Sequence, residues 1–352
     1  MVCDSATGGD EAKAALSRIA DSCVLGVTRL PMSRQVGLGD WKNYRAVARL
    51  AAERGVNVLH GHGAKGGAYA RLAGRTLKRR GKAAHAFYTP HGGSLHYSPS
   101  TLMGRVYIAA EQRLAPLTDG LIFESVFAAR RYNELIGVPA CPMRVVPNGL
   151  HPHEFYEPVV ADDAADFVYV GELRYLKGVD LLLTALAAQA TVYPARAIIV
   201  GGGPDEDKLK RLARSLGLGA KVNFTGPRPA RNMFSKARCV VVPSRAESFP
   251  YIVLEAAAAR MPLIATDVGG VPEIVAGTST PLVQAGNADA LAAQMRAFLA
   301  NPRPFLGRAT ELQAHVAKRF TVQAMTEAIV DFYLSEIEAA RTKRMPIPAT
   351  AT

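Results

Sequence analysis

The stretch CVVVPSRAESFPYIVLEAAAARMPLIATDVGGVPEIV, residues 239–275, carries the strongest fold signal in this chain. It opens with the β-branched run Val240–Val242, which is typical of a parallel strand buried on both faces. After a short polar loop, apolar residues recur at helical spacing from about Ser248, and a second strand is expected at Pro262–Thr266. A turn with two glycines then opens another helix. The stretch therefore predicts a strand–helix–strand unit of a parallel α/β sheet.

Two glutamates in this unit, Glu247 and Glu255, are candidate ligand-binding residues. Glu247 is predicted in the loop and Glu255 about two turns into the helix, so a rise of about 1.5 Å per residue places them roughly 12 Å apart. The unpaired amides of the helix N-terminus between them suit a diphosphate, although Pro250 removes one amide from the predicted first turn. One carboxylate would bind ribose hydroxyls and the other the hydroxyls of a sugar. The alternative is that both are solvated helix residues, as most glutamates are.

Strands and helices alternate along the rest of the chain, which predicts parallel, doubly wound sheets. With 352 residues, two domains are expected. Residues 151–166, rich in proline and acidic side chains, are predicted as the linker, with domains at 1–160 and 161–319 and a C-terminal helix at 320–345 that packs back on the first. Further strands are expected at 24–27, 56–59, 84–89, 120–124, 144–146, 167–170, 197–200 and 222–225, and helices at 12–19, 41–54, 100–115, 126–135, 179–190, 205–216, 289–299 and 322–343.

Histidines stand at two glycine-rich turns of the N-terminal half. His60 and His62 are expected in the loop after the strand at 56–59, lining a ligand cleft. No third ligand follows them with metal-site spacing, so no metal is expected. His91 follows the strand at 84–89, at the carboxyl edge where open α/β sheets bind ligands. The alternative for His91 is a structural histidine.

A second candidate site follows the strand at 167–170. Gly171 begins a strand-to-helix turn that also carries Arg174 and Lys177. Cations at such a turn suit a pyrophosphate, with Lys177 as a point charge and Arg174 as a planar fork. The alternative is a surface loop with ordinary basic residues.

The motifs above resemble the retaining glycosyltransferases of family 4, most specifically over residues 167–275. The matching letters are PS at 243–244, ESF at 247–249, LEA at 254–256, GGVPE at 269–273 and PNG at 147–149. The resemblance implies the GT-B fold, in which two Rossmann-like domains face a cleft. It implies that Glu255 holds the ribose of a nucleotide-sugar donor and that Glu247 and His91 lie beside the donor sugar. Ser248 and Phe249 would belong to the donor site.

The resemblance extends to two further positions and departs at one. Gly226 matches a turn that lies by the nucleobase, and Lys177 matches a cationic position of the donor site. Many members carry arginine directly after the glycine of the donor loop, where this chain has Glu172, so the resemblance supports Lys177 and does not extend to Arg174.

The family begins with a strand and a glycine-rich loop for which this chain has no counterpart before Val24. Met1–Asp4 instead resembles the second strand of the family. We therefore expect the central strand of the N-terminal sheet to be absent, which exposes two ladders of backbone groups and opens the core. Either the natural start lies upstream or this form is impaired.

The composition, with 49% apolar and 20% charged residues, is typical of a folded globular protein. The sequence contains no run of 18 apolar residues, so no membrane-spanning helix is expected. Four cysteines without CxxC spacing fit a reducing cytoplasm, and the polar N-terminus is no signal peptide.

Residues 1–150 hold 20 Lys and Arg against 10 Asp and Glu, while residues 151–352 hold 22 against 20. This basic half, with the amphipathic helix at 41–54 that carries Trp41, predicts contact with an anionic membrane rather than nucleic acid. The alternative for this helix is packing on a sheet.

The sequence thus predicts a cytoplasmic enzyme that moves a hexose-type sugar from a nucleotide diphosphate, UDP- or GDP-linked, to a lipid-linked or polysaccharide acceptor, with retention and without metal or other cofactor. The donor, acceptor and linkage stay open. Two alternatives are kept: a sugar-nucleotide epimerase of the same fold, which needs no acceptor, and a non-catalytic nucleotide-sugar-binding or assembly subunit.

Overall fold

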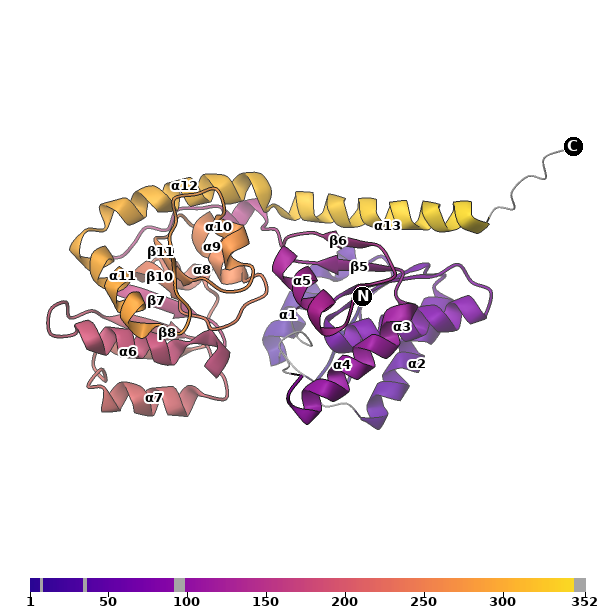
Figure 1. The fold of residues 1–352 in the computed structure, drawn as a ribbon, viewed down its shortest axis with the longest axis horizontal. Coiled ribbons are helices and arrows are strands. Elements are labelled where there is room, and N and C mark those ends of the chain that lie inside the picture. The colour runs from indigo at the N-terminus through magenta and orange to yellow at the C-terminus, as the bar shows by residue number, and fades with distance from the viewer. Residues whose placement is uncertain (7–8, 34–36, 92–98, 345–352) are drawn as a thin grey trace, which may run out of the picture. The chain divides into compact units, whose positions relative to one another are not determined.

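The computed structural model describes residues 1–6, 9–33, 37–91 and 99–344, which fold into two compact units (Figure 1). The first unit comprises Met1–Phe123, Arg130–Arg144 and Val330–Thr352, and the second comprises Glu124–Ala129 and Val145–Ile329. The expected linker, residues 151–166, lies wholly in the second unit.

The second unit is built on a parallel sheet with the strand order β12-β11-β10-β7-β8-β9. The order reverses between β7 and β10, which is where doubly wound sheets bind ligands. Its strands are β7 (Ala165–Val170), β8 (Ala197–Val200), β9 (Val222–Gly226), β10 (Ala237–Val242), β11 (Leu263–Thr266) and β12 (Leu282–Val283). Its helices are α6 (Val179–Gln189), α7 (Glu206–Ser215), α8 (Arg231–Phe234), α9 (Tyr251–Ala258), α10 (Val271–Val275), α11 (Ala288–Ala300) and α12 (Arg303–Arg319), followed by α13 (Val322–Arg344), whose residues from Val330 belong to the first unit.

Helices cover both faces of this sheet, as the apolar strands require. Along β10, Val240 and Val242 belong to a buried cluster with α8, α9 and α12, while Cys239 and Val241 belong to a cluster with α6, α7 and α11. Successive side chains of a strand point to opposite faces, so a strand covered on both faces is apolar throughout. The predicted doubly wound sheet is confirmed here.

The first unit contains a sheet of order β3-β4-β5-β6 and a separate parallel pair, β1-β2. Helices α2 and α3 pack on each other and on β3 through Ala48, Ala51, Leu59, Ala73 and Leu77. Its strands are β1 (Val2–Asp4), β2 (Thr28–Leu30), β3 (Val58–His62), β4 (His85–Thr89), β5 (Gly120–Phe123) and β6 (Met143–Val145). The helices are α1 (Gly9–Ile19), α2 (Leu38–Glu53), α3 (Gly63–Arg79), α4 (Leu102–Leu114) and α5 (Val126–Leu135), the last shared between the units.

The core of the first unit is interrupted beside β3. In the part of the chain that the structure describes, β3 pairs with β4 alone and β1 with β2 alone. A cavity of about 930 Å³ runs along both β1 and β3 and is also lined by α2 and α3. Apolar side chains such as Val2 and Leu25 line it and stay 38% and 46% exposed. The sheet pairing, and with it the core, is discontinuous at this point.

Three expectations for the elements are wrong. The run Val24–Val27 is not a strand, and Val24 is 95% exposed; the strand lies at Thr28–Leu30, where it pairs with β1. Three elements of the second unit, α8, α12 and β12, were not predicted from the sequence. Helix α9 begins at Tyr251 rather than Ser248, so Pro250 precedes the helix instead of occupying its first turn.

Among the described residues, no helix combines the length and apolarity needed to cross a membrane.

Candidate functional site

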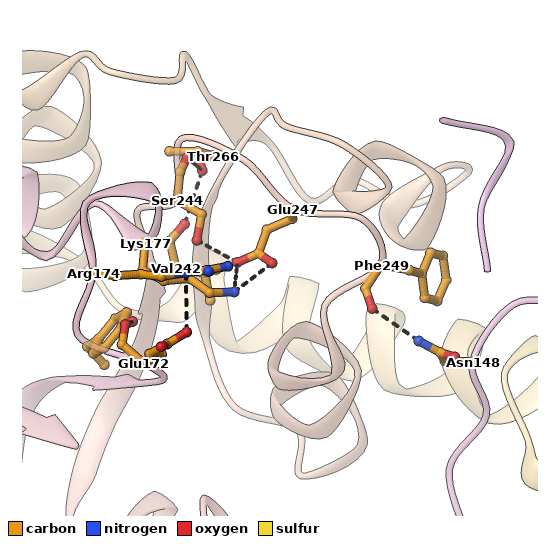
Figure 2. A network of polar contacts seen from close by, with 10 residues as sticks. Asn148, Glu172, Arg174, Lys177, Val242, Ser244, Glu247, Phe249 and Thr266 are labelled. Carbon is orange, nitrogen blue, oxygen red and sulfur yellow. Dashed lines mark hydrogen bonds and ion pairs between the residues drawn. The ribbon is translucent and has the colours of Figure 1, made fainter. Parts of the chain in front are cut away.

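Glu247 is the centre of a polar network in the second unit (Figure 2). The residue is 6% exposed, and both of its carboxylate oxygens accept hydrogen bonds of 2.8 Å from Nζ of Lys177. Ser244 Oγ donates a further hydrogen bond of 2.7 Å to Oε1. Burying a carboxylate is costly without a partner, and the cation and the hydroxyl compensate this cost through charge-assisted hydrogen bonds.

Backbone packing brings Lys177 to Glu247. Lys177 lies in the turn after β7, and the next residue, Gly178, has φ of +68°. A Cβ at Gly178 would lie 1.9 Å from the carbonyl oxygen of Pro243, so only glycine permits this approach of the two loops. On the other side, Thr266 Oγ1 donates to the Ser244 carbonyl at 2.6 Å. The ends of β7, β10 and β11 thus jointly position the ion pair.

Arg174 lies in the same turn but pairs differently. Its Nε lies 3.3 Å from Oε2 of Glu172, the residue at which the sequence departs from the family pattern (Figure 2). Gly171 precedes them, directly after β7. A Cβ at Gly201 would lie 1.8 Å from the carbonyl oxygen of Gly171, so the close approach of these two backbone segments requires glycine at position 201. The predicted cationic turn therefore exists, with each cation paired to a carboxylate.

Glu255 lies in α9 and borders a separate small cavity of about 130 Å³. Glu154, Tyr156 and Arg231 line the same cavity. Burial and, secondarily, the charge of Glu154 raise the pKa of Glu255 above its ordinary value. Because α9 starts three residues later than predicted, the separation of about 12 Å derived from a continuous helix does not apply to this pair.

Ser248 and Phe249 lie in the loop before α9. Ser248 Oγ donates a hydrogen bond to the buried Glu124. The Phe249 carbonyl accepts a hydrogen bond of 3.2 Å from Nδ2 of Asn148, as Figure 2 shows. Gly226 ends β9 with φ of +70°. Glu124 was not among the residues predicted from the sequence. It could have been found as a carboxylate that directly follows the apolar strand β5.

In the first unit, His60, His62 and His91 form a cluster. His62 Nδ1 lies 2.7 Å from Nε2 of His91, and the rings of His60 and His62 are 4.1 Å apart. The prediction of His60 and His62 as loop residues is wrong: both belong to β3, which pairs through His62 with Thr89 of β4. In the described residues, no group of three or more His, Cys, Asp or Glu side chains is arranged to hold a metal ion.

Comparison with known families matches both halves of the chain. Residues 154–319 match the family described as glycosyl transferases group 1, and residues 1–149 match the glycosyl transferase 4-like domain. The chain belongs to the group 1 glycosyltransferases.

Curated relatives of this glycosyltransferase chain include proteins named for two different activities. D-inositol 3-phosphate glycosyltransferase 1 of Catenulispora acidiphila is 29% identical over 94% of this chain and 79% of its own length. Glycogen synthase of Mycobacterium tuberculosis is 30% identical over 71% of this chain and 61% of its own length. The D-inositol 3-phosphate glycosyltransferase of Mycolicibacterium paratuberculosis is 35% identical over 51% of this chain. The match with that protein spans 42% of its length, less than half.

Solved structures show the fold. Alr3699/HepE of Anabaena, solved in complex with UDP-glucose, superposes with a TM-score of 0.77 at 19% identity, covering 95% of this chain and 99% of that one. Sucrose-phosphate synthase of Thermosynechococcus elongatus gives a TM-score of 0.75 at 22% identity, over 89% and 84% of the two chains. The predicted GT-B fold with two Rossmann-like domains is confirmed.

Proposed function

We propose that this glycosyltransferase moves a hexose-type sugar from a nucleotide diphosphate donor to a lipid-linked or glycan acceptor, with retention at the anomeric carbon. The observation that carries the proposal is the buried Lys177–Glu247 pair at the carboxyl ends of β7 and β10, where the strand order reverses. The HepE structures with UDP and UDP-glucose support a nucleotide-sugar donor for this fold.

Different residues of the second unit would bind different parts of the donor. Lys177 and Arg174 would exchange part of their pairing with Glu247 and Glu172 for the diphosphate, stabilising the negative charge that develops on the leaving group. Glu255 would accept hydrogen bonds from the ribose hydroxyls. Glu247 would orient the donor hexose, and His91 is proposed as a residue that contacts the same sugar. We assign no nucleophile to the protein, and the cations take the charge-neutralising role without a metal.

The acceptor assignment rests on the basic N-terminal half. Helix α2 exposes Trp41 to 60% among basic side chains, and residues 1–150 carry an excess of 10 positive charges, 20 against 10. A basic surface with an exposed aromatic fits the headgroup region of an anionic membrane, where a lipid-linked acceptor of cell-envelope or exopolysaccharide synthesis would lie.

The test is donor turnover by the purified chain over a panel of UDP and GDP sugars, with membrane extract as acceptor and product analysis by mass. Glu255→Ala should lower kcat/KM roughly 10- to 100-fold, because hydrogen bonds to a charged group contribute about 1.5–3 kcal/mol. Glu327→Ala, an exposed glutamate of α13, is the matched control and should leave turnover unchanged. Equal turnover in both variants would contradict the role of Glu255.

One observation favours a second candidate, a nucleotide-sugar-binding subunit without turnover. The cavity beside β3 leaves the core of the first unit open, while the sheet of the second unit is continuous. This candidate predicts donor binding that depends on Glu255 but no product with any donor. An epimerase would instead form a new sugar nucleotide without acceptor, which the same product analysis detects.

A further inference from the structure

Three imidazoles stand in a row at the carboxyl ends of β3 and β4. The ring centroids of His60 and His62 are 4.1 Å apart, and those of His62 and His91 are 5.0 Å apart with an interplanar angle of 19°. All three residues belong to the first unit. The proposed function uses His91 alone and leaves the other two unexplained.

The contact between His62 and His91 is directional. Their ring nitrogens Nδ1 and Nε2 lie 2.7 Å apart, a distance at which two bare lone pairs would repel. One nitrogen must therefore carry a hydrogen that the other accepts. Because a neutral imidazole has one N–H and one lone pair, this bond also decides which nitrogen of each ring is protonated.

The row is anchored at its other end. Nε2 of His60 lies 2.9 Å from Thr89 Oγ1, and Nδ1 lies 2.5 Å from the hydroxyl of Tyr333 in α13. Tyr333 stays protonated near neutral pH because burial raises its pKa to about 12. Both nitrogens of His60 are thus engaged, so its ring forms a fixed surface that His62 contacts at an interplanar angle of 36°.

The backbone of His91 needs such support. Its φ is +50°, in the left-handed region that residues with a Cβ rarely occupy. Conformations of this kind persist where surrounding contacts determine them, and they cluster at functional sites. The hydrogen bond between His62 and His91 is a contact that constrains this residue.

We propose that His62 is the positioning residue of His91: its Nδ1 accepts the hydrogen of His91 Nε2 and holds that ring in one tautomer and one orientation toward the donor sugar. His60, fixed by Thr89 and Tyr333, keeps His62 in place through the contact between their rings. This assignment rests on the proposed function for His91.

The experiment compares two substitutions that separate hydrogen bonding from stacking. His62→Asn keeps an acceptor oxygen near the position of Nδ1, whereas His62→Phe keeps the stacked ring and loses the acceptor. His315→Phe, in α12 of the second unit, is the matched control. The first readout is the ¹⁵N spectrum of the histidine rings in the unliganded full chain, and the second is kcat and donor KM for sugar transfer or donor hydrolysis.

In the wild type and in His62→Asn, His91 should show a single tautomer with the hydrogen on Nε2. In His62→Phe it should show a mixture, and kcat should fall about five- to tenfold with donor KM nearly unchanged, the loss expected for one neutral hydrogen bond. The control should match the wild type in both readouts.

Two results would overturn the proposal. An unchanged His91 spectrum in His62→Phe would show that His62 does not set its tautomer, and a changed spectrum with undiminished kcat would show that the tautomer has no role in transfer. If the wild type binds donor but shows no turnover, the proposed function fails, and the catalytic part of this inference fails with it. The spectra alone then decide whether the hydrogen bond exists.

Discussion

The ion pair between Lys177 and Glu247 joins two loops that are distant in the sequence. The depth at which this pair is buried decides how much it contributes to stability. Glu247 has a side chain that is 7% exposed, while that of Lys177 is 21% exposed. Burying a carboxylate at this depth is costly when its partner is removed. The cation that we propose for donor binding therefore also contributes to stability.

Lys177→Met should destabilise the second unit by about 2–3 kcal/mol, less than the ~3–5 kcal/mol of a fully buried pair, because Lys177 keeps some contact with water. Urea unfolding measures this difference. The control is Lys210→Met, which removes the more exposed pair with Glu206 and should cost under about 1 kcal/mol. Equal losses in the two variants would mean that burial does not strengthen the Glu247 pair.

The histidine row makes the stability of the first unit depend on pH. Burial, followed by the charges of His62 and His91, lowers the pKa of His60 from 6.5 to about 3. Burial and the charge of His91 lower that of His62 to about 4, although its exposed edge lets water screen part of the effect. Below pH 6.5 the unfolded chain therefore binds protons that the folded chain does not, so stability falls as the pH falls.

We expect His60 alone to contribute a slope of up to about 1.4 kcal/mol per pH unit between pH 6.5 and 4.5. His60→Gln should be less stable than the wild type at pH 7, because its contacts with Thr89 and Tyr333 change. The difference in unfolding free energy between the two should shrink as the pH falls to 4.5. A difference that is constant with pH would show that His60 is not held neutral.

At the scale of elements, α3 and α4 are joined by a buried ion pair. Arg71 is 0% exposed, and its Nη1 donates to Oε2 of Glu111 at 2.9 Å. Tyr88 of β4 donates to the other oxygen at 3.0 Å, and the guanidinium stacks over its ring. These contacts join the two helices to strand β4.

Glu111→Ala should destabilise the first unit by about 3–5 kcal/mol, because it leaves the Arg71 charge buried without a counterion. Thermal or urea unfolding would measure it. Glu134→Ala removes an exposed pair with Arg131 and should change the unfolding free energy by less than about 1 kcal/mol. If Glu111→Met combined with Arg71→Met were no more stable than Glu111→Ala alone, the unpaired charge would not be the cause.

Element types were predictable where apolar patterns were long and bounded by glycine or proline. The helix at Val126–Leu135 and the strand at Ala197–Val200 have the predicted bounds, and Ser125 caps that helix by accepting from the Ala128 amide. The run at Val24–Val27 has the same apolar character but finds no neighbouring strand, whereas Thr28–Leu30 pairs with β1. Strand formation needs a partner, and local composition does not supply that information.

At the scale of the whole molecule, the two units differ in how completely their sheets are built. Strand β7 is paired on both edges, with β8 and β10. Within the described residues, β3 is paired on one edge and borders the cavity of about 930 Å³ on the other. Backbone amides at an open edge exchange with solvent through smaller local openings than those of a central strand.

Hydrogen exchange should therefore be faster by orders of magnitude in β3 than in β7, and protection in β1 should be as low as in β3. The measurement is mass-spectrometric exchange on the full chain at neutral pH. Strand β10, paired on both edges in the second unit, provides the internal reference and should behave like β7. Protection of β3 equal to that of β10 would contradict an open core.

The sequence by itself determined the family and the doubly wound sheets, and it singled out Glu247, Glu255 and Lys177 as candidate donor-site residues. The geometry of a strand-to-helix turn with glycine depends on a few neighbouring residues, so a short motif is enough to predict it. Only the tertiary structure decided that Lys177 pairs with Glu247 and that His62 meets His91, because these contacts join segments tens of residues apart. It also decided the shape of the cavity in the first unit, since packing depends on which strands find partners and not on any one segment.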